Sequence, residues 1–106
     1  MEIIHLDIGG THPMSVARST LCADKDSFLT KLFSSGDELK PMKVKDDEGK
    51  ERIFIDRPGH SLYQVINFLQ TSKLTLPEFE SIPERKAFFD ELAFWHIETH
   101  FKFDAI

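Results

Sequence analysis

The residues of this chain that could do chemistry begin with a pair of histidines. His96 and His100 stand four positions apart, the spacing at which two imidazoles on one helix can share a zinc ion. A zinc site needs further ligands, and the sequence offers neither a glutamate next to His96 nor an evident third ligand. We therefore interpret both histidines as surface or capping residues and expect no metal site.

The remaining candidates lack the partners that catalysis requires. Gly9 and Gly10 could bring backbone N–H groups close to a phosphate, but the lysine and following helix of nucleotide-binding loops are missing, which favours a plain turn. Cys22 has no assignable base that would make it a nucleophile. His60 and Asp90 are titratable, but nothing in the sequence positions them together. The sequence predicts a protein that is not an enzyme and uses no cofactor.

One charged pair allows two interpretations. Asp56 and Arg57 come directly after a short apolar run and directly before a Pro-Gly break. They could hold their own turn together through side-chain to backbone hydrogen bonds, or they could form ion pairs across a contact between subunits. The residue types alone leave both possibilities open.

Length and composition favour one soluble domain. The 106 residues match the size of a single domain, which we expect to span residues 1–106. A net charge of −5 argues against binding to a nucleic-acid backbone. The single cysteine is typical of a reducing compartment, so we expect a cytoplasmic protein. No apolar run approaches the ~18 residues of a membrane helix, and we expect no membrane insertion.

Phenylalanine is unusually frequent. The chain has ten Phe residues but only one Tyr and one Trp. A core this small has little room for ten phenyl rings, so some of them are expected to line a surface that binds a partner. The alternative, that Phe is simply the preferred filler of this core, remains open.

Alternating hydrophobicity predicts two hairpins. Residues 4–8 alternate apolar and polar side chains, and residues 14–17 form the returning strand, with Pro13 in the loop or at the start of that strand. Residues 42–44 and 53–55 form the second hairpin, with Gly49 in its turn.

Helical spacing predicts the other elements. A first helix is capped by Asp24 and ends near Gly36, a second carries an apolar stripe within residues 62–69, and a third opens with a capping box at residues 81–84. A last short helix is expected at residues 97–101. The predicted buried positions are Phe28, Leu29, Leu32 and Phe33 in the first helix, Leu62, Val65, Ile66 and Leu69 in the second, and Phe88, Leu92 and Trp95 in the third. This order of strands and helices is typical of an α+β domain.

Several motifs, taken in order, resemble the BTB/POZ domains of the potassium-channel tetramerisation subclass. The resemblance runs from Ile4 to about Phe101 and implies a BTB/POZ fold, a small mixed sheet of hairpins packed against a cluster of helices. The motifs are residues 6–10 (Leu-Asp-Ile-Gly-Gly), 18–21 (Arg-Ser-Thr-Leu), 26–29 with 32–34, 53–57 (Ile-Phe-Ile-Asp-Arg), 65–77 and 91–95 (Glu-Leu-Ala-Phe-Trp).

The sequence departs from this family at two places. Pro13 stands where the family has an aromatic residue, and the stretch from Gly10 to Arg18 is one residue longer, which predicts an irregular first hairpin. Channel members also carry a zinc cluster of histidine and cysteine, whereas this chain has only Cys22. The resemblance therefore does not imply a metal site here.

The resemblance implies self-assembly into a ring of four or five subunits through polar faces, which is a closed heterologous arrangement. The matching positions that would make these contacts are Asp7, Arg18, Asp56 and Arg57. Many relatives that are not channels also recruit a cullin-type ubiquitin ligase scaffold. The apolar residues expected to bind this partner are Phe28, Leu32, Phe94 and Trp95. Two other functions remain open: a small enzyme or ligand-binding protein with a Phe-lined pocket, and a monomeric competitor of larger BTB proteins.

Overall fold

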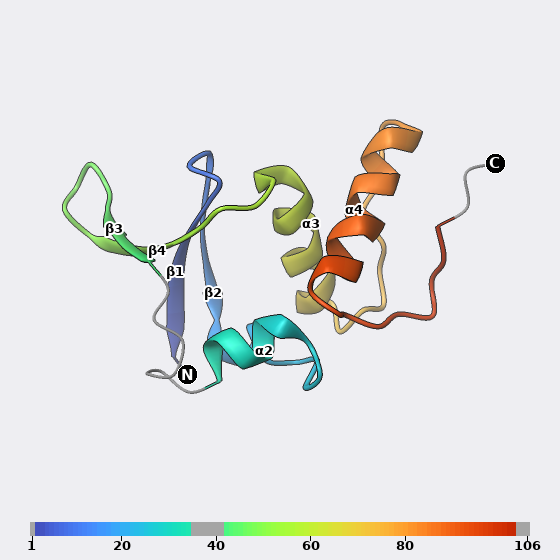
Figure 1. The fold of residues 1–106 in the computed structure, drawn as a ribbon, viewed down its shortest axis with the longest axis horizontal. Coiled ribbons are helices and arrows are strands. Elements are labelled where there is room, and N and C mark those ends of the chain that lie inside the picture. The colour runs from blue at the N-terminus through green and yellow to red at the C-terminus, as the bar shows by residue number, and fades with distance from the viewer. Residues whose placement is uncertain (1, 35–41, 104–106) are drawn as a thin grey trace.

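A computed structural model describes residues 2–34 and 42–103 of the chain. Its helices and strands follow the predicted α+β order, with the sheet and α4 at opposite ends of the molecule and α3 between them (Figure 1). Along the chain the elements are β1 (Ile3–Ile8), β2 (His12–Ala17), α1 (Arg18–Leu21), α2 (Phe28–Phe33), β3 (Met42–Lys45), β4 (Glu51–Ile55), α3 (Gly59–Gln70) and α4 (Ile82–Phe94).

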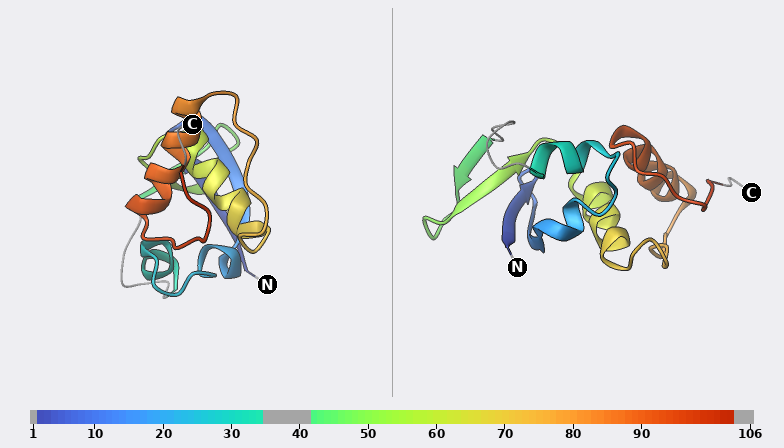
Figure 2. Two further views of the ribbon diagram at one scale, coloured as in Figure 1. Left: turned by 90° about the vertical axis from the view of Figure 1, so that its right-hand side faces the viewer. Right: turned by 90° about the horizontal axis from the view of Figure 1, so that it is seen from below.

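The four described strands form one mixed sheet in the order β2-β1-β4-β3. Each hairpin is antiparallel, and the two hairpins are joined by the parallel pairing of β1 with β4. The hairpin of β3 and β4 extends away from the helices (Figure 2). Its turn contains Gly49 at φ +81°, as the sequence predicts.

The predicted irregularity of the first hairpin is wrong. Its register is continuous from Ile3 opposite Ala17 to Ile8 opposite His12. Pro13 lies within β2, opposite Asp7. Because β2 is an edge strand, a proline there is tolerated when its missing N–H would face solvent.

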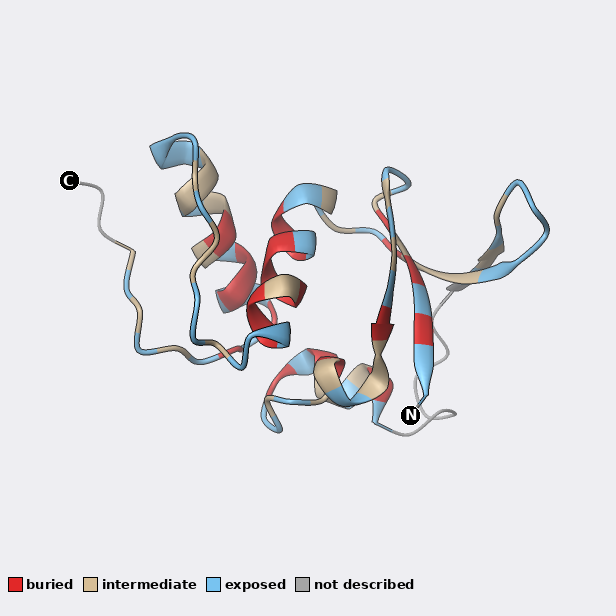
Figure 3. Cartoon of the chain, turned by 180° about the vertical axis from the view of Figure 1, so that it is seen from behind, coloured by how far each residue is buried: buried red, intermediate tan, exposed pale blue. Residues whose placement is uncertain are grey.

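The core lies between the sheet and α4, and α3 fills its centre. Buried residues are concentrated in α3 and in parts of β1 and α4 (Figure 3). The predicted stripe of α3 is confirmed, since all four of its residues are at most 4% exposed. Within the described residues, no helix is both long and apolar enough to span a membrane. The fully enclosed side chains of the centre include Leu6, Ile8, Leu21, Leu29, Leu62, Ile66, Phe68 and Phe88.

The first predicted helix corresponds to α2, its predicted cap is wrong, and the short helix α1 before it was not predicted. Ser27 is the N-cap of α2, and its Oγ accepts a hydrogen bond from the Thr30 N–H at 3.1 Å. Asp24 lies in the loop between α1 and α2, where its carboxylate has other partners. The predicted end at Gly36 lies outside the described residues.

The predicted N-cap of α4 is confirmed, whereas the short helix predicted after its C-terminal end is wrong. Ser81 caps the helix as predicted, and its Oγ accepts from the Glu84 N–H at 3.2 Å. The predicted helix at residues 97–101 is absent from the described structure. His96 adopts φ +58°, and the Ile97 N–H bonds back to the Leu92 carbonyl at 2.9 Å, which closes α4 with a left-handed cap.

Candidate protein-interaction surfaces

Arg57 is bound to α4 within the chain. It lies in the link between β4 and α3, where its Nε and Nη2 donate to the two carboxylate oxygens of Glu91 at 3.1 and 2.7 Å. The Glu91 side chain is 2% exposed, whereas that of Arg57 is 28% exposed. Hydrogen bonding to Glu91 raises the pKa of the Arg57 guanidinium above its already high ordinary value. Arg57 was expected either to stabilise its own turn or to form an ion pair between subunits. The structure shows an ion pair within the chain, but this pair connects Arg57 to α4 and not to its own turn.

At the C-terminal end of α4, Trp95 is buried in the core and Phe94 is exposed to solvent. Trp95 is 6% exposed, which confirms its predicted burial, and its Nε1 donates to Glu91 Oε2 at 2.8 Å. Although Trp95 was also expected to bind the partner, its side chain faces the core. Its neighbour Phe94 is 45% exposed. The guanidinium carbon of Arg57 lies 3.6 Å from the centroid of the Phe94 ring, in cation–π contact.

A second exposed ring approaches the same helix end. Phe28 is 39% exposed, so its predicted burial is wrong: it is the first residue of α2, and its N–H donates to the Trp95 carbonyl at 2.8 Å. Its ring stacks on His96 with the centroids 4.2 Å apart. We call Phe28, Phe94 and His96 the aromatic surface. Leu32, which was expected to belong to it, is half-buried and packs against the core.

The residues expected at subunit contacts fall into two groups. Asp7 lies opposite Phe54 near the carboxyl ends of the parallel strands β1 and β4, and the exposed Asp56 and the half-buried Arg57 follow β4 directly. Arg18 lies at the other end of β1, where its backbone N–H donates to the Glu2 carbonyl at 2.9 Å. The first hairpin therefore separates Arg18 from the other three residues.

Arg18 also has its charge matched within the chain. Its Nε and Nη2 donate to the Glu2 carboxylate at 2.7 and 2.8 Å, and its Nη1 donates to the Phe33 carbonyl. These bonds connect the start of β1 to the end of α2. Since the side chain of Arg18 remains 26% exposed and that of Glu2 62% exposed, the pair lies at the surface.

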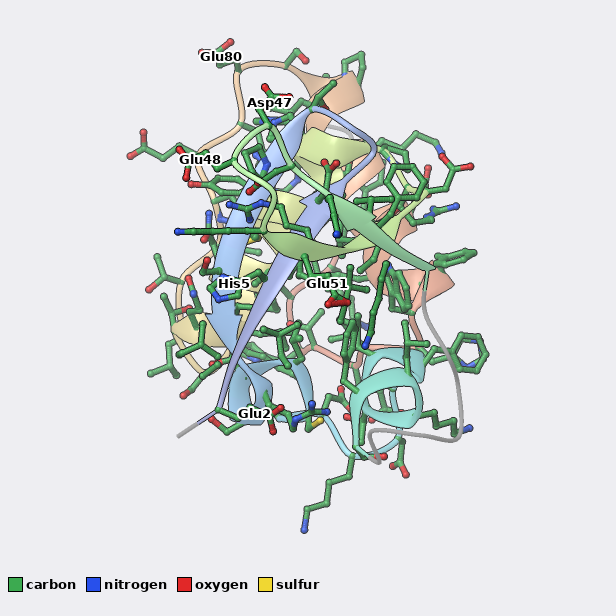
Figure 4. The ribbon with its side chains drawn as sticks, turned by 90° about the vertical axis from the view of Figure 1, so that its left-hand side faces the viewer. Glu2, His5, Asp47, Glu48, Glu51 and Glu80 are labelled. Carbon is green, nitrogen blue, oxygen red and sulfur yellow. The ribbon has the colours of Figure 1, made fainter. Side chains whose placement is uncertain are left out.

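Figure 4 views the molecule from the side of the sheet turned away from α4. Asp47 and Glu48 lie near each other at the turn between β3 and β4, whereas Glu2 and Glu51 lie apart from them. Glu80 belongs to the segment that leads into α4. His5 Nδ1 lies 2.8 Å from Ser15 Oγ across the first hairpin.

The titratable candidates are not brought together. His60 Nε2 lies 2.6 Å from Glu84 Oε2, whereas Asp90 pairs with Lys86 at 2.7 Å. Burial raises the pKa of the half-buried Cys22 thiol, which disfavours a thiolate. Among residues 2–34 and 42–103, no group of three or more His, Cys, Asp or Glu residues is arranged to hold a metal ion.

The Gly-Gly pair is a turn, as predicted. Gly9 and Gly10 have φ values of +62° and +77°, and the Gly9 N–H donates to the Ile55 carbonyl at 2.8 Å. A Cβ atom on Gly9 would lie 2.7 Å from the Arg57 carbonyl oxygen. Gly9 is therefore needed both for its backbone conformation and for the close approach of the chain after β4.

The most informative residue of this region, Glu91, was not singled out from the sequence. A signal for it exists, because Glu91 and Trp95 are four positions apart on a helix and therefore share a face. Its pairing with Arg57, which is 34 positions away, has no comparable local signal.

The described part of the chain is thus a mixed sheet packed on helices, with two exposed phenyl rings at one end of α4. Comparison with known families identifies this arrangement, because the family model described as the BTB/POZ domain matches residues 4–103. The chain belongs to the BTB/POZ domain family, of the potassium-channel tetramerisation type. Domains of this family are protein-interaction modules that typically oligomerise.

Proposed function

We propose that the chain assembles with copies of itself into a closed ring of four or five subunits. A ring requires two different, complementary patches on each subunit. The observation that carries the proposal is the separation of the candidate contact residues along β1, with Arg18 at its start and Asp7, Asp56 and Arg57 at its end. Across a strand of six residues this separation is roughly 15–20 Å, enough for two distinct patches.

We further propose that the assembled domain acts in the cytoplasm as an adaptor for a cullin-type ubiquitin ligase scaffold. The aromatic surface supports this part of the proposal, because two large apolar side chains are exposed at the same end of α4, and aromatic residues are enriched in protein-binding sites. Trp95, one of the residues expected to contact the scaffold, contributes from behind by supporting Phe94, since their rings pack edge to face at 5.1 Å.

The absolute mass in solution tests the self-assembly. Light scattering over a concentration series should give a mass four or five times the 12.2 kDa of one chain at micromolar concentration. A monomer mass at high micromolar concentration and low salt would contradict assembly. If this monomer still bound a longer BTB protein, the chain would act as a competitor.

Binding to the N-terminal domain of a cullin tests the adaptor role. Phe94→Ala should weaken binding at least tenfold, because an exposed ring at the centre of a contact contributes strongly to affinity. Leu74→Ala is the matched control, since Leu74 is 75% exposed but lies in the loop after α3. Equal effects of the two substitutions would show that the aromatic surface is not the binding site.

A further inference from the structure

Glu91 is a buried carboxylate that accepts three hydrogen bonds from side chains. Two come from Arg57, and the third comes from the indole of Trp95. A buried charge is stable only when it is paired and hydrogen-bonded. Both donors are immobilised by the same carboxylate, and each contacts a residue of the aromatic surface.

The first connection runs from Glu91 through Arg57 to Phe94. Two donors of the guanidinium are held by two carboxylate oxygens, and this bidentate pair fixes the plane of the guanidinium. The guanidinium carbon lies over the Phe94 ring, 3.6 Å from its centroid. Fixing Arg57 therefore restricts the rotation of an exposed phenyl ring.

The second connection runs from Glu91 through Trp95 to Phe28. The hydrogen bond from Nε1 holds the indole, and the carbonyl of the same residue accepts the N–H of Phe28. This places the first residue of α2 against the end of α4, where the Phe28 ring stacks on His96.

We propose that Glu91 is the positioning residue of the aromatic surface, acting through Arg57 on Phe94 and through Trp95 on Phe28. The functional part of this inference rests on the proposed role of that surface in binding a partner. A surface that is already ordered in the free protein loses less side-chain entropy on binding, so Glu91 raises affinity without contacting the partner.

The geometry also indicates the chemistry of the partner. Arg57 Nη1 has no acceptor among the described residues, and it adjoins the exposed ring of Phe94. A fitting partner segment presents an apolar side chain to the ring and a carbonyl or carboxylate oxygen to Nη1. The partner is thus a protein segment in which an apolar residue adjoins an acceptor.

The first test measures the order of the rings in the free protein. We would label phenylalanine with ¹³C and compare Glu91→Gln with wild type by NMR relaxation, together with the exchange rate of the Trp95 indole proton. Phe94 and Phe28 should become more mobile and indole exchange should accelerate at least tenfold, while the core ring of Phe88 stays unchanged. Unchanged surface rings, or equal loosening of Phe88, would overturn the proposal.

Two further variants separate positioning from loss of structure. Arg57→Lys leaves Glu91 paired but removes the bidentate bond and the planar guanidinium over the Phe94 ring, so it should free Phe94 and leave Phe28 ordered. Arg57→Lys also tests the proposal if the Glu91→Gln protein does not fold. Glu84→Gln removes another bonded carboxylate from α4, at its N-terminal end, and should leave both surface rings ordered. Loosening of both rings by all three variants would mean that Glu91 is merely structural.

The second test is a double-mutant cycle with the cullin N-terminal domain as the probe. Glu91→Gln should weaken binding at least tenfold in the wild-type background and have almost no effect in the Phe94→Ala background, because both act on one contact. Additive effects would overturn the inferred positioning. If the wild-type protein does not bind the probe, the proposed adaptor role is wrong. The positioning role of Glu91 is then decided by the NMR measurements of the rings alone.

Discussion

The ammonium group of Lys73 lies 2.7 Å from Oδ2 of Asp24 and so connects the end of α3 to the loop between α1 and α2. The same ammonium donates to the Glu98 carbonyl at 2.6 Å, and the Glu98 N–H donates to Asp24 Oδ2 at 3.1 Å. Three segments that are distant in sequence therefore meet at one carboxylate. This arrangement holds the chain after α4 against the rest of the domain.

Asp24→Asn should destabilise the protein by about 1–3 kcal/mol at neutral pH, because it removes the charge from a largely buried hydrogen-bonded pair. Burial alone would raise the pKa of Asp24, but hydrogen bonds from Lys73 and Glu98 outweigh it and lower the pKa. The folded protein thus holds this proton less tightly than the unfolded chain. The stabilisation is complete above the unfolded value of about 3.9 and is lost as the pH falls through the lower folded value.

Urea unfolding between pH 7 and pH 3 checks this prediction. The difference in unfolding free energy between wild type and Asp24→Asn should be constant down to about pH 5 and shrink below about pH 4. Asp26→Asn is the control, because Asp26 is exposed and close in sequence. A difference that persists unchanged at the lowest pH would show that the carboxylate charge is not the cause.

Ser72→Gly should stabilise the protein by about 0.5–1 kcal/mol. Ser72 adopts φ +56°, a left-handed conformation that is unfavourable for a residue with a Cβ atom but easy for glycine. Thermal and urea unfolding of the variant measure the gain. Thr75→Gly, three positions on and not among the residues with positive φ, should instead destabilise slightly because glycine makes the unfolded chain more flexible.

Ile66→Ala should destabilise the protein by about 2–5 kcal/mol, as is usual when a large buried side chain is truncated. Ile66 is fully buried on the face of α3 that lies within the core. Gln70→Ala, at the exposed end of the same helix, is the control and should change stability by less than about 0.5 kcal/mol. A cost below about 1 kcal/mol for Ile66→Ala would contradict the tight packing at this position.

The parts of the fold that were predictable are those with a local cause. The alternation of residues 4–8 and the stripe of α3 reflect burial on one face, and Gly49 and Ser81 act within a few residues of their own positions. The cap of α2 was misassigned because Asp24 and Ser27 are both good capping residues; Ser27 caps the helix, whereas the Asp24 carboxylate makes the tertiary contact with Lys73.

The candidate surface was predictable only in part, for the same reason. The burial of Trp95 was predictable, because Phe88, Leu92 and Trp95 follow helical spacing and Phe94 lies outside this stripe. The spacing does not predict that the buried Glu91 binds the indole, or that Arg57 reaches Glu91 from a segment far away in sequence. Contacts of this kind depend on the packing of whole elements and leave no periodic pattern.

The last prediction is that assembly depends on charge. Ionic contacts at partly solvated interfaces weaken with salt, since the screening length falls from about 10 Å at 0.1 M to about 3 Å at 1 M. The mass measured by light scattering should therefore shift toward the monomer as salt is raised over this range. A mass that is constant or increases would indicate an apolar interface instead.

Asp56 and Arg57 allow the interface to be tested apart from the fold. Arg57→Ala breaks the bond to Glu91 and should lower the unfolding free energy by about 3–5 kcal/mol, as expected when a buried carboxylate loses its partner. Asp56 is exposed and has no hydrogen-bond partner among the described residues, so Asp56→Ala should leave stability nearly unchanged. If this end of β4 forms a subunit contact, Asp56→Ala should nevertheless shift the mass toward the monomer at equal folded concentration. Added salt should then reduce the oligomer mass of wild type more than that of the variant, because the variant has already lost the ionic contact. If Asp56→Ala has the oligomer mass and the salt response of wild type, the subunit contact does not lie at this end of the sheet.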